Sequence, residues 1–402
     1  MTTNLAQQFL LDPDVVFLNH GSFGACPRPV FEDYQRWQLK LERQPVEFLS
    51  SQRELGNNLR TVREAMAAEF GTSTENIAAV TNATSGLNIV AQSIPLNEGD
   101  EILTTDHEYS ALEKTWKFVC RRTGAKIVEV EVPLPLTSAK QFYDAIVAGM
   151  TDRTKVLFLS HITSPTALLF PIEGVIVEAR KRGIISVIDG AHTPGHIPLN
   201  LDAIGADFYS GNCHKWLMSP KGSAFVHARP EMQAMLDPLV ISHGWTVDNK
   251  EPGVRGPFGN SPFVDEVEMQ GTRDPSAWLA VPAAINFRRQ NDWWSVAADC
   301  RRLAQETAGR LRALTGLEPL SSPEFSAPQM VSMPIPECDP VAVHDLLVSR
   351  YKIEIPVLAW RGHHIVRLSC QGYNRRDQMD LLIDALTDLL SLGKPRARAA
   401  NA

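Results

Sequence analysis

The sequence predicts an α/β protein, in which a large domain with a mostly parallel central sheet and helices on both faces precedes a smaller α+β C-terminal domain. The first observation is that short apolar runs (KIVEVEV, KVLFLSHI, GIISVIDGAH) alternate with amphipathic helical stretches between residues 76 and 199, as in βαβ units. The second is that strand-like runs and a final helix, RRDQMDLLIDALTDLL, follow residue 314. A chain of 402 residues, 44% of them hydrophobic, is long enough for both domains.

One βαβ unit can be followed residue by residue. The stretch PIEGVIVEARKRG lies between two apolar runs, its apolar residues recur at helical spacing, and Gly183 provides a stop before the next strand. Residues 229–270 are rich in Gly and Pro and show little periodicity, which predicts a long surface excursion that is mobile or lies at a subunit contact. Helical spacing returns from residue 276 to about residue 314.

Charge and composition exclude several classes of function. The chain has 39 basic and 46 acidic residues, a net charge of −7, and its one basic stretch is the terminal KPRARAANA, so we expect no nucleic-acid surface. The N-terminus lacks the pattern of a signal peptide, and no apolar run approaches the ~20 residues that span a bilayer. The six cysteines are far apart without a CxxC pair, so we expect a reducing, cytoplasmic setting and no membrane contact.

Asp189 and Lys215 are the residues most suggestive of chemistry. Asp189 ends an apolar strand, where side chains of a parallel sheet point into the ligand-binding crevice. Lys215 lies in the apolar stretch DFYSGNCHKWLMSPKG, and burying an ammonium is costly unless the amine loses its proton or is engaged covalently. The alternatives are a turn or helix-cap role for Asp189 and a lysine that reaches solvent past Trp216.

A phosphate site and an aromatic face are also indicated. In AAVTNATSGLN, hydroxyl and amide side chains stand between an apolar strand and a helix that begins near Ser85, where backbone N–H groups bind phosphate; a plain N-cap is the alternative. His107 or Tyr109, after the next strand, offers a ring for stacking. A lysine, a carboxylate, an aromatic face and a phosphate cradle are together what pyridoxal phosphate requires.

These motifs resemble the class V aminotransferase-like family of fold-type I pyridoxal-phosphate enzymes, and more closely its isopenicillin N epimerase-like branch. The resemblance covers nearly the whole chain. Its carriers, in the order of that branch, are FLNHGSFGACP, TNATSGLN, TTDHEYSAL, VIDGAHTPG, DFYSGNCHKWLMSPKG, MQGTRDPSAWLAVPAAI and VRLSCQGYN.

The resemblance implies a role for each residue of the cofactor site. Lys215 would carry the cofactor as a Schiff base, Asp189 would pair with the pyridine nitrogen, and Tyr109 would stack on the ring. The remaining cofactor-binding residues are expected to be His192 at the ring's hydroxyl edge, Ser164 beside the cofactor, and Ala83, Thr84 and His214 at the phosphate. Gly271 and Thr272 match a segment that reaches the neighbouring subunit's phosphate, which implies a homodimer with active sites at the subunit interface.

Substrate contacts follow in the same way. Arg367 is similar to the family's carboxylate-binding arginine, whose planar fork grips a carboxylate with two hydrogen bonds; without the resemblance, a surface salt bridge would be the natural interpretation. Asn19, His20 and Gly21 match an N-terminal loop that closes near the substrate carboxylate. We therefore expect an N-terminal segment near the site (1–20), a large cofactor-binding domain (21–280), a small domain (281–393) and a disordered tail (394–402).

One departure from the family matters for function. The cysteine desulfurases of this class carry a reactive cysteine on a long loop before the carboxylate-binding arginine, whereas YKIEIPVLAWRGHHIVRLS is short and has none. Cys213 and Cys370 are interpreted as buried apolar residues, which disfavours persulfide chemistry. Arg361, His363 and His364 lack helpful carboxylate or cysteine neighbours, so no metal is expected.

The predicted function is removal of the Cα proton of an amino acid or an amino-acid-containing peptide. Lys215 is the expected base, and Tyr109, across the ring, the expected proton donor of an epimerase or racemase. A C–S lyase that expels a group from Cβ is the alternative within the branch. A second alternative is a pyridoxal-phosphate-binding protein without turnover.

Overall fold

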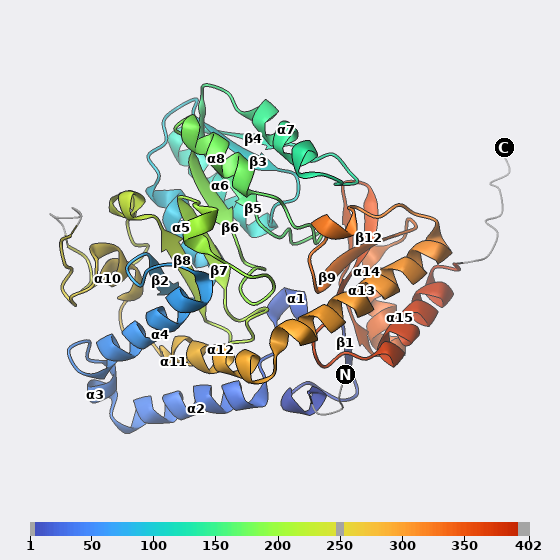
Figure 1. Cartoon of the computed structure of the whole chain (residues 1–402), viewed down its shortest axis with the longest axis horizontal. Helices are drawn as coiled ribbons and strands as arrows, with labels where there is room; N and C mark the ends of the chain where they lie inside the picture. The colour runs from blue at the N-terminus through green and yellow to red at the C-terminus, as the bar shows by residue number, and fades with distance from the viewer. Residues whose placement is uncertain (1–4, 247–252, 393–402) are drawn as a thin grey trace.

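The computed structural model describes residues 5–246 and 253–392, so the predicted tail lies outside the described residues. A seven-stranded sheet forms the centre of the large domain, in the order β2-β8-β7-β6-β5-β3-β4 (Figure 1). The strands are β2 (Ile77–Val80), β3 (Glu101–Thr105), β4 (Lys126–Val130), β5 (Thr154–Ser160), β6 (Ile185–Asp189), β7 (Phe208–Asn212) and β8 (Ala224–Ala228). All neighbours are parallel except β8, which runs antiparallel to β2 and β7. The predicted mostly parallel sheet is confirmed.

Both faces of this sheet are buried under helices. Along β2, Ile77 and Ala79 pack into one apolar core, whereas Ala78 and Val80 pack into the other. The first core is covered by α4 (Glu54–Phe70), α7 (Ala139–Gly149) and α8 (Glu173–Lys181), and the second by α5 (Ala83–Ser93) and α6 (Ser110–Thr123). The inner strands, such as β5 and β6, are buried on both faces, which explains why their sequences are continuous apolar runs, whereas the edge strand β4 is partly exposed.

The small domain is a three-stranded antiparallel sheet with helices packed on it. Its strands are β9 (Met330–Ile335), β11 (Val357–Trp360) and β12 (His363–Ser369), and its helices are α13 (Trp293–Thr315), α14 (Pro340–Tyr351) and α15 (Arg376–Leu389). α12 (Val281–Gln290) contributes Val281 and Ile285 to the large domain's core. α12, which lies inside the expected small domain (281–393), therefore packs on the large domain's core, and α13 is the next helix along the chain.

The N-terminal segment connects the two domains. β1 (Val16–Phe17) pairs in parallel with β10 (Ile353–Glu354) of the small domain, and α1 (His20–Phe23) follows directly. Gly24 then passes the backbone of the Lys215 segment so closely that a Cβ would lie 2.0 Å from the His214 carbonyl oxygen, and its φ is +69°. Only glycine fits both requirements.

Residues 229–270 match the predicted surface excursion only up to about residue 259, because most described residues before that point are exposed or half-buried. The segment contains a 3-10 helix, η2 (Pro230–Met235), and α10 (Pro262–Glu268), all of whose residues are buried. Glu268 on α10 forms a buried ion pair with Arg63, whose second nitrogen donates to Asn260 at 2.7 Å. These long-range partners make α10 part of the core, and no local periodicity reveals them. Residues 247–252 lie outside the described residues.

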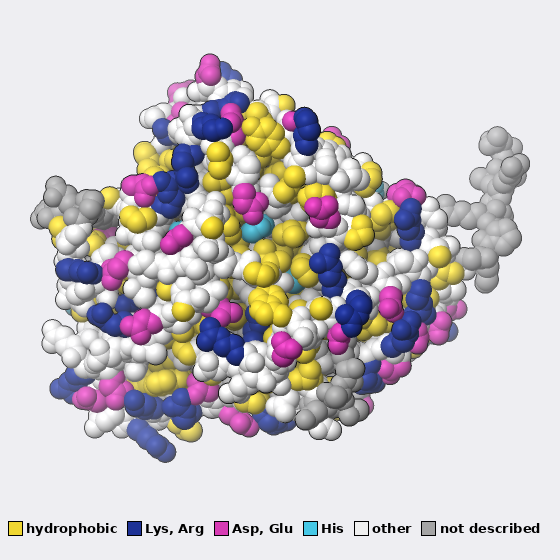
Figure 2. Space-filling view, viewed as in Figure 1, with side chains coloured by type: hydrophobic (Ala, Val, Ile, Leu, Met, Phe, Trp, Pro, Cys, Tyr) yellow, Lys and Arg dark blue, Asp and Glu magenta, His cyan; other side chains and the backbone are white. Residues whose placement is uncertain are grey.

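The remaining helices complete the fold. They are η1 (Ala6–Gln8), α2 (Arg28–Arg43), α3 (Pro45–Leu49), α9 (Leu201–Ile204), α11 (Ser276–Leu279) and η3 (Pro323–Phe325). Across 5–246 and 253–392, no helix is both long and apolar enough to cross a membrane. On the face shown in Figure 2, basic and acidic side chains are interspersed, and hydrophobic side chains gather near the middle.

Candidate active site

A cavity of about 170 Å³ lies where several strands of the parallel sheet reach their carboxyl ends. Ser160 ends β5 and Asp189 ends β6, and the two are paired in the sheet register. The lining residues are Ser22, Phe23, Asn82, Ala83, Thr84, Tyr109, Ser160, Ile162, Ser164, Asp189, Ala191, His192, Asn212, His214 and Lys215. The structure thus brings eight predicted site residues together, namely Ala83, Thr84, Tyr109, Ser164, Asp189, His192, His214 and Lys215.

Asp189 is a buried carboxylate that needs a cation. Its side chain is only 4% exposed, and its Oδ1 accepts a hydrogen bond from the Ala191 N–H at 2.8 Å. Burial raises the pKa of Asp189 to about 6, while the hydrogen bond from Ala191 and the charge of Lys215 act in the opposite direction. A protonated nitrogen in the cavity would stabilise the ionised form of this carboxylate.

Lys215 presents its amine to the same cavity. Its Nζ lies 3.0 Å from His192 Nε2, and the Trp216 indole donates to the other ring nitrogen of His192 at 3.3 Å. Burial and the nearby Arg367 charge lower the pKa of Lys215 to about 7, against the opposing effect of Asp189. A substantial fraction of this amine is therefore neutral near pH 7, as a nucleophile or base requires.

The N-terminus of α5 forms another wall. Asn82 caps this helix, because its Oδ1 accepts from the Ser85 N–H at 2.8 Å. The Ala83 N–H is occupied, since it donates to Asn212 Oδ1 at 2.8 Å. The His214 Nδ1–H donates to the Ser223 carbonyl at 3.3 Å, which leaves Nε2 for a ligand. Of the predicted phosphate contacts, Thr84 and His214 therefore keep more hydrogen-bonding capacity for a ligand than Ala83 does.

A second, open pocket of about 560 Å³ adjoins this cavity through Tyr109 and Ser164, which line both. Arg367 on β12 lies at its base and is 5% exposed. Its Nη1 donates to the Ser164 carbonyl oxygen, its Nη2 donates to Ser22 Oγ at 2.9 Å, and its buried Nε has no hydrogen-bond partner. Burial lowers the pKa of Arg367 to about 10. Arg367 is therefore a buried cation facing a pocket, not a surface salt-bridge residue.

The three predicted N-terminal residues lie behind the cavity wall. Asn19 donates from Nδ2 to Glu354 at 2.9 Å and accepts from Ser22 Oγ at 2.6 Å. His20 Nε2 donates to the Lys215 carbonyl at 3.1 Å, and a Cβ on Gly21 would lie 2.7 Å from Met330 Sδ. The residues of this loop that reach the cavity are Ser22 and Phe23, in the same FLNHGSFGACP motif.

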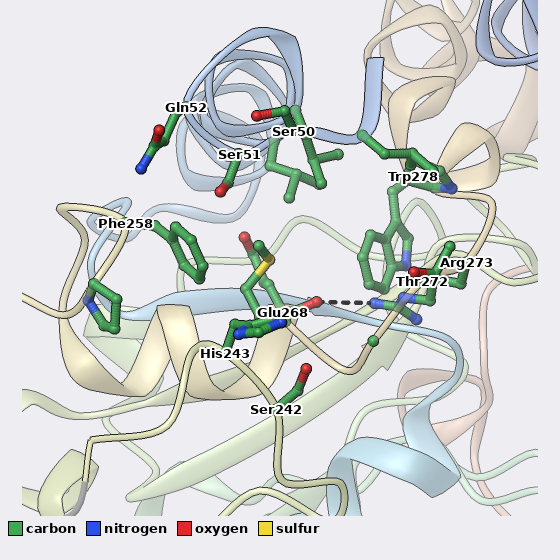
Figure 3. A pocket seen from close by; sticks show the side chains of 17 residues that line it. Ser50, Ser51, Gln52, Ser242, His243, Phe258, Glu268, Thr272, Arg273 and Trp278 are labelled. Carbon is green, nitrogen blue, oxygen red and sulfur yellow. Dashed lines mark hydrogen bonds between the residues drawn. The ribbon is translucent and has the colours of Figure 1, made fainter. Parts of the chain in front are cut away.

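Gly271 and Thr272 are not near Lys215 within this chain. They line a separate pocket of about 580 Å³ with Ser242 and His243 (Figure 3). In this pocket the Arg273 guanidinium lies 3.6 Å from the centre of the Trp278 ring, and Arg273 Nη2 donates to the Glu268 carbonyl at 3.4 Å. Within their own chain, Gly271 and Thr272 therefore line this pocket and not the Lys215 cavity.

Sequence reasoning missed Glu108, a buried acid one residue before Tyr109. Its carboxyl oxygens accept from Thr105 Oγ1 at 2.7 Å and from Ser160 Oγ at 2.6 Å. Burial is the main cause that raises the pKa of Glu108 to about 8, with a smaller contribution from the charge of Asp189. The only available signal was its position inside TTDHEYSAL, because no spacing rule identifies a neutral carboxylic acid.

The cysteines are placed as interpreted. Cys213 and Cys370 are buried, and burial raises the pKa of both thiols well above the usual range, so neither forms a thiolate readily. Within residues 5–246 and 253–392, no group of His, Cys, Asp and Glu side chains is arranged to hold a metal ion.

The residues of the cavity fit pyridoxal phosphate. Lys215 offers an amine for the aldehyde carbon, and Asp189 offers a buried carboxylate for the ring nitrogen. Tyr109 provides an aromatic wall, and the capped start of α5 lies opposite as a site for an anion. The fold and this set of groups define a pyridoxal-phosphate-dependent enzyme.

The comparisons with known proteins agree. Residues 25–382 match the aminotransferase class-V family model, and the chain belongs to this family. It is 36% identical to the isopenicillin N epimerase of Amycolatopsis lactamdurans over 96% of this chain and 98% of that protein. It is also 28% identical to a probable chloroplastic L-cysteine desulfhydrase of Arabidopsis thaliana, over 95% and 84% of the two chains. The cysteine desulfurase CsdA of Escherichia coli shares the fold, with a TM-score of 0.78 at 21% identity over 97% and 99% of the chains. Pyridoxal 5'-phosphate is the cofactor.

Proposed function

We propose that this protein is an epimerase of the isopenicillin N epimerase type, which inverts Cα of a small amino acid or of an amino-acid-containing peptide. The observation that carries the proposal is the 36% identity to an isopenicillin N epimerase over nearly the full length of both chains. The single cavity in which Lys215, Asp189 and Tyr109 meet supports it. When bound, pyridoxal phosphate supplies an electron sink that acidifies the Cα proton of an attached amino acid.

Four residues would hold the cofactor and the substrate. Lys215 Nζ would bind the aldehyde carbon as a Schiff base in the resting enzyme, and the Asp189 carboxylate would hold a proton on the ring nitrogen. Thr84 and the α5 N-terminus would bind the phosphate. Arg367 would bind the substrate carboxylate, because it is a buried guanidinium whose Nε has no partner within the chain.

Lys215 and Tyr109 are the proposed proton carriers. With a substrate bound, the neutral Nζ of Lys215 would accept the Cα proton on one side, since the pKa of this amine is lowered to about 7. The Tyr109 hydroxyl would return a proton to the opposite face of Cα. Tyr109 suits this role because it lines both the cofactor cavity and the open substrate pocket.

A C–S lyase is the second candidate, and the similarity to a probable L-cysteine desulfhydrase favours it. The open pocket of about 560 Å³ beside Arg367 favours the epimerase, because a substrate as small as cysteine would leave most of it empty. The acidic and basic side chains of its wall, Glu113, Glu129 and Arg361, suit an extended polar substrate. The buried thiols Cys213 and Cys370 offer no persulfide carrier.

The deciding experiment follows α-proton exchange in deuterated water for a panel of L-amino acids and amino-acid-containing peptides. An epimerase yields deuterated D and L products, whereas a lyase yields a keto acid and a released thiol or sulfide. Tyr109→Phe should keep the yellow chromophore and lose epimerisation, and Lys215→Ala should lose both. Full epimerisation by Tyr109→Phe would reject the role of Tyr109, and no exchange with any substrate would favour a binding protein without turnover.

We further propose a cytoplasmic homodimer. Gly271 and Thr272 line a pocket away from Lys215 in their own chain, as expected if they serve the cofactor phosphate of the neighbouring subunit. All six cysteines are free, which suits a reducing compartment.

A further inference from the structure

Trp216 is held rigidly behind the cavity. It is fully buried, its ring stacks on His196 with a centroid separation of 3.9 Å, and the His20 ring lies 4.9 Å away on a tilt of 50°. His196 is itself fixed, because its Nε2 accepts from the Gln329 N–H at 2.9 Å. The indole therefore has little freedom to turn its N–H elsewhere.

The indole N–H decides the tautomer of His192. An indole nitrogen can only donate, and Trp216 Nε1 lies 3.3 Å from His192 Nδ1, so Nδ1 must be the acceptor. Burial and the neighbouring positive charges lower the pKa of His192 well below its usual value, so the ring is neutral. A neutral imidazole that accepts at Nδ1 carries its proton on Nε2, the atom that faces Lys215.

This proton is directed at the lysine amine. His192 Nε2 lies 3.0 Å from Lys215 Nζ, and an N–H at that position can be satisfied only by a lone pair on the lysine nitrogen. An ammonium would instead place two donors face to face. We propose that Trp216 is a positioning residue, which fixes the His192 proton on Nε2 and thereby keeps Lys215 as a neutral amine. The inference deepens the proposed function, because Lys215 is its base.

Other groups around Lys215 also affect the balance between its neutral amine and its ammonium form. A test of Trp216 must leave these groups unchanged. Arg367 favours the neutral amine and Asp189 favours the ammonium. His192 is also flanked by His196 and His214, both of which burial keeps neutral. None of these side chains accepts the indole proton, so replacing the indole leaves their direct contacts with Lys215 in place.

The test is Trp216→Phe, which removes the N–H and keeps an aromatic ring between His196 and His20. The pKa of Lys215 is measured in the full-length protein freed of cofactor, by competitive acetylation across pH and mass spectrometry of the Lys215 peptide. Loss of one neutral hydrogen bond predicts a rise of about 0.5–1 pH unit in this pKa. In the holoenzyme, the apparent pKa on the acid side of the pH profile of kcat should rise by the same amount. An unchanged Lys215 pKa would overturn the proposal.

Two controls separate this effect from a packing defect. Trp293→Phe makes the same replacement at a buried indole whose Nε1 has no hydrogen-bond partner, and it should leave the Lys215 pKa unchanged. In a His192→Leu background, Trp216→Phe should cause no additional shift. An additional shift in that background, or an equal shift in Trp293→Phe, would contradict the proposal.

A measurement on the unsubstituted protein remains decisive if Trp216→Phe does not fold. With ¹⁵N-labelled histidine, the His192 resonances, assigned by their loss in His192→Leu, should show the proton on Nε2. A proton on Nδ1 would refute the inference. Acetylation and NMR need no turnover. The inference about Trp216 can therefore be refuted while the epimerase assay is positive, and it can hold while that assay is negative.

Discussion

Arg367 shows how burial gives a single residue its proposed role. A guanidinium that is 5% exposed usually has a carboxylate partner, yet Arg367 donates its hydrogen bonds to oxygens of Ser164 and Ser22. A substrate carboxylate would complete its hydrogen bonding. The family resemblance predicted a carboxylate-binding role for Arg367, but the residues around it in the sequence do not distinguish a pocket cation from a surface one. Only the packing of β12 against Ser22 and Ser164 does so.

Replacing Arg367 with lysine should therefore weaken substrate use while preserving the charge. A lysine cannot make the two parallel hydrogen bonds of a guanidinium, so kcat/KM should fall by about 10- to 100-fold. Steady-state kinetics on a substrate and on its carboxamide analogue check this prediction. If the variant and the parent differ equally on both compounds, Arg367 does not bind the carboxylate.

Glu108 predicts a pH dependence of stability. Its pKa is about 8 in the folded protein and 4.5 when exposed, so the folded state binds the proton more tightly. The resulting stabilisation is complete below pH 4.5 and is lost as the pH rises through 8. Glu108→Gln has no such proton to lose. Relative to this variant, the parent should lose on the order of 3 kcal/mol of unfolding free energy between pH 5 and pH 9.

Urea unfolding at several pH values measures that difference. Glu113→Gln is the matched control, because the Glu113 side chain is 38% exposed and its removal should leave the pH profile unchanged. Parallel pH profiles for Glu108→Gln and the parent would show that Glu108 is ionised in the folded protein.

At the scale of elements, the start of α5 combines structure and function. Asn82 caps the helix through the Ser85 N–H, and its neighbours Ala83 and Thr84 line the cavity. Asn82→Ala should lower the unfolding free energy by about 1 kcal/mol, and Asn82→Asp should recover most of it, since aspartate caps equally well. Thermal unfolding with and without cofactor checks this. If Asn82→Ala unfolds like the parent, the cap is unimportant.

The elements show where sequence reasoning works and where it stops. The strands that end in Ser160 and Asp189 were predictable, because strands buried on both faces are continuous apolar runs with polar residues at their ends. α10 was not, because its burial depends on Arg63, about 200 positions away in the sequence. The sequence predicted Asn19, His20 and Gly21 at the cavity, whereas Ser22 and Phe23, a few positions later, line it. The motif identifies the loop but not which of its side chains face inward.

At the scale of the whole molecule, the dimer proposal predicts complementation. Lys215→Ala and a Thr272→Asp variant, whose added charge repels a phosphate, should each be inactive. If Thr272 serves the neighbouring subunit, each mixed dimer contains one intact site out of two, and mixed dimers make up half of the pool, so about one site in four is intact. Refolding an equal mixture should restore about a quarter of the parent activity. Activity no greater than the sum of the two separate variants would place Thr272 in its own subunit's site or in none.

The pairing of β1 with β10 has a practical consequence. The strand pairs with the small domain, and five residues after its end the same segment supplies Ser22 to Arg367 and a wall to the cofactor cavity. Proteolytic cleavage after Phe23 would remove β1 from the small domain. It would also expose the cofactor cavity of the large domain to water. Preparations of this protein should accordingly be checked for intact amino-terminal peptides before a weak colour or a low turnover is attributed to the catalyst itself.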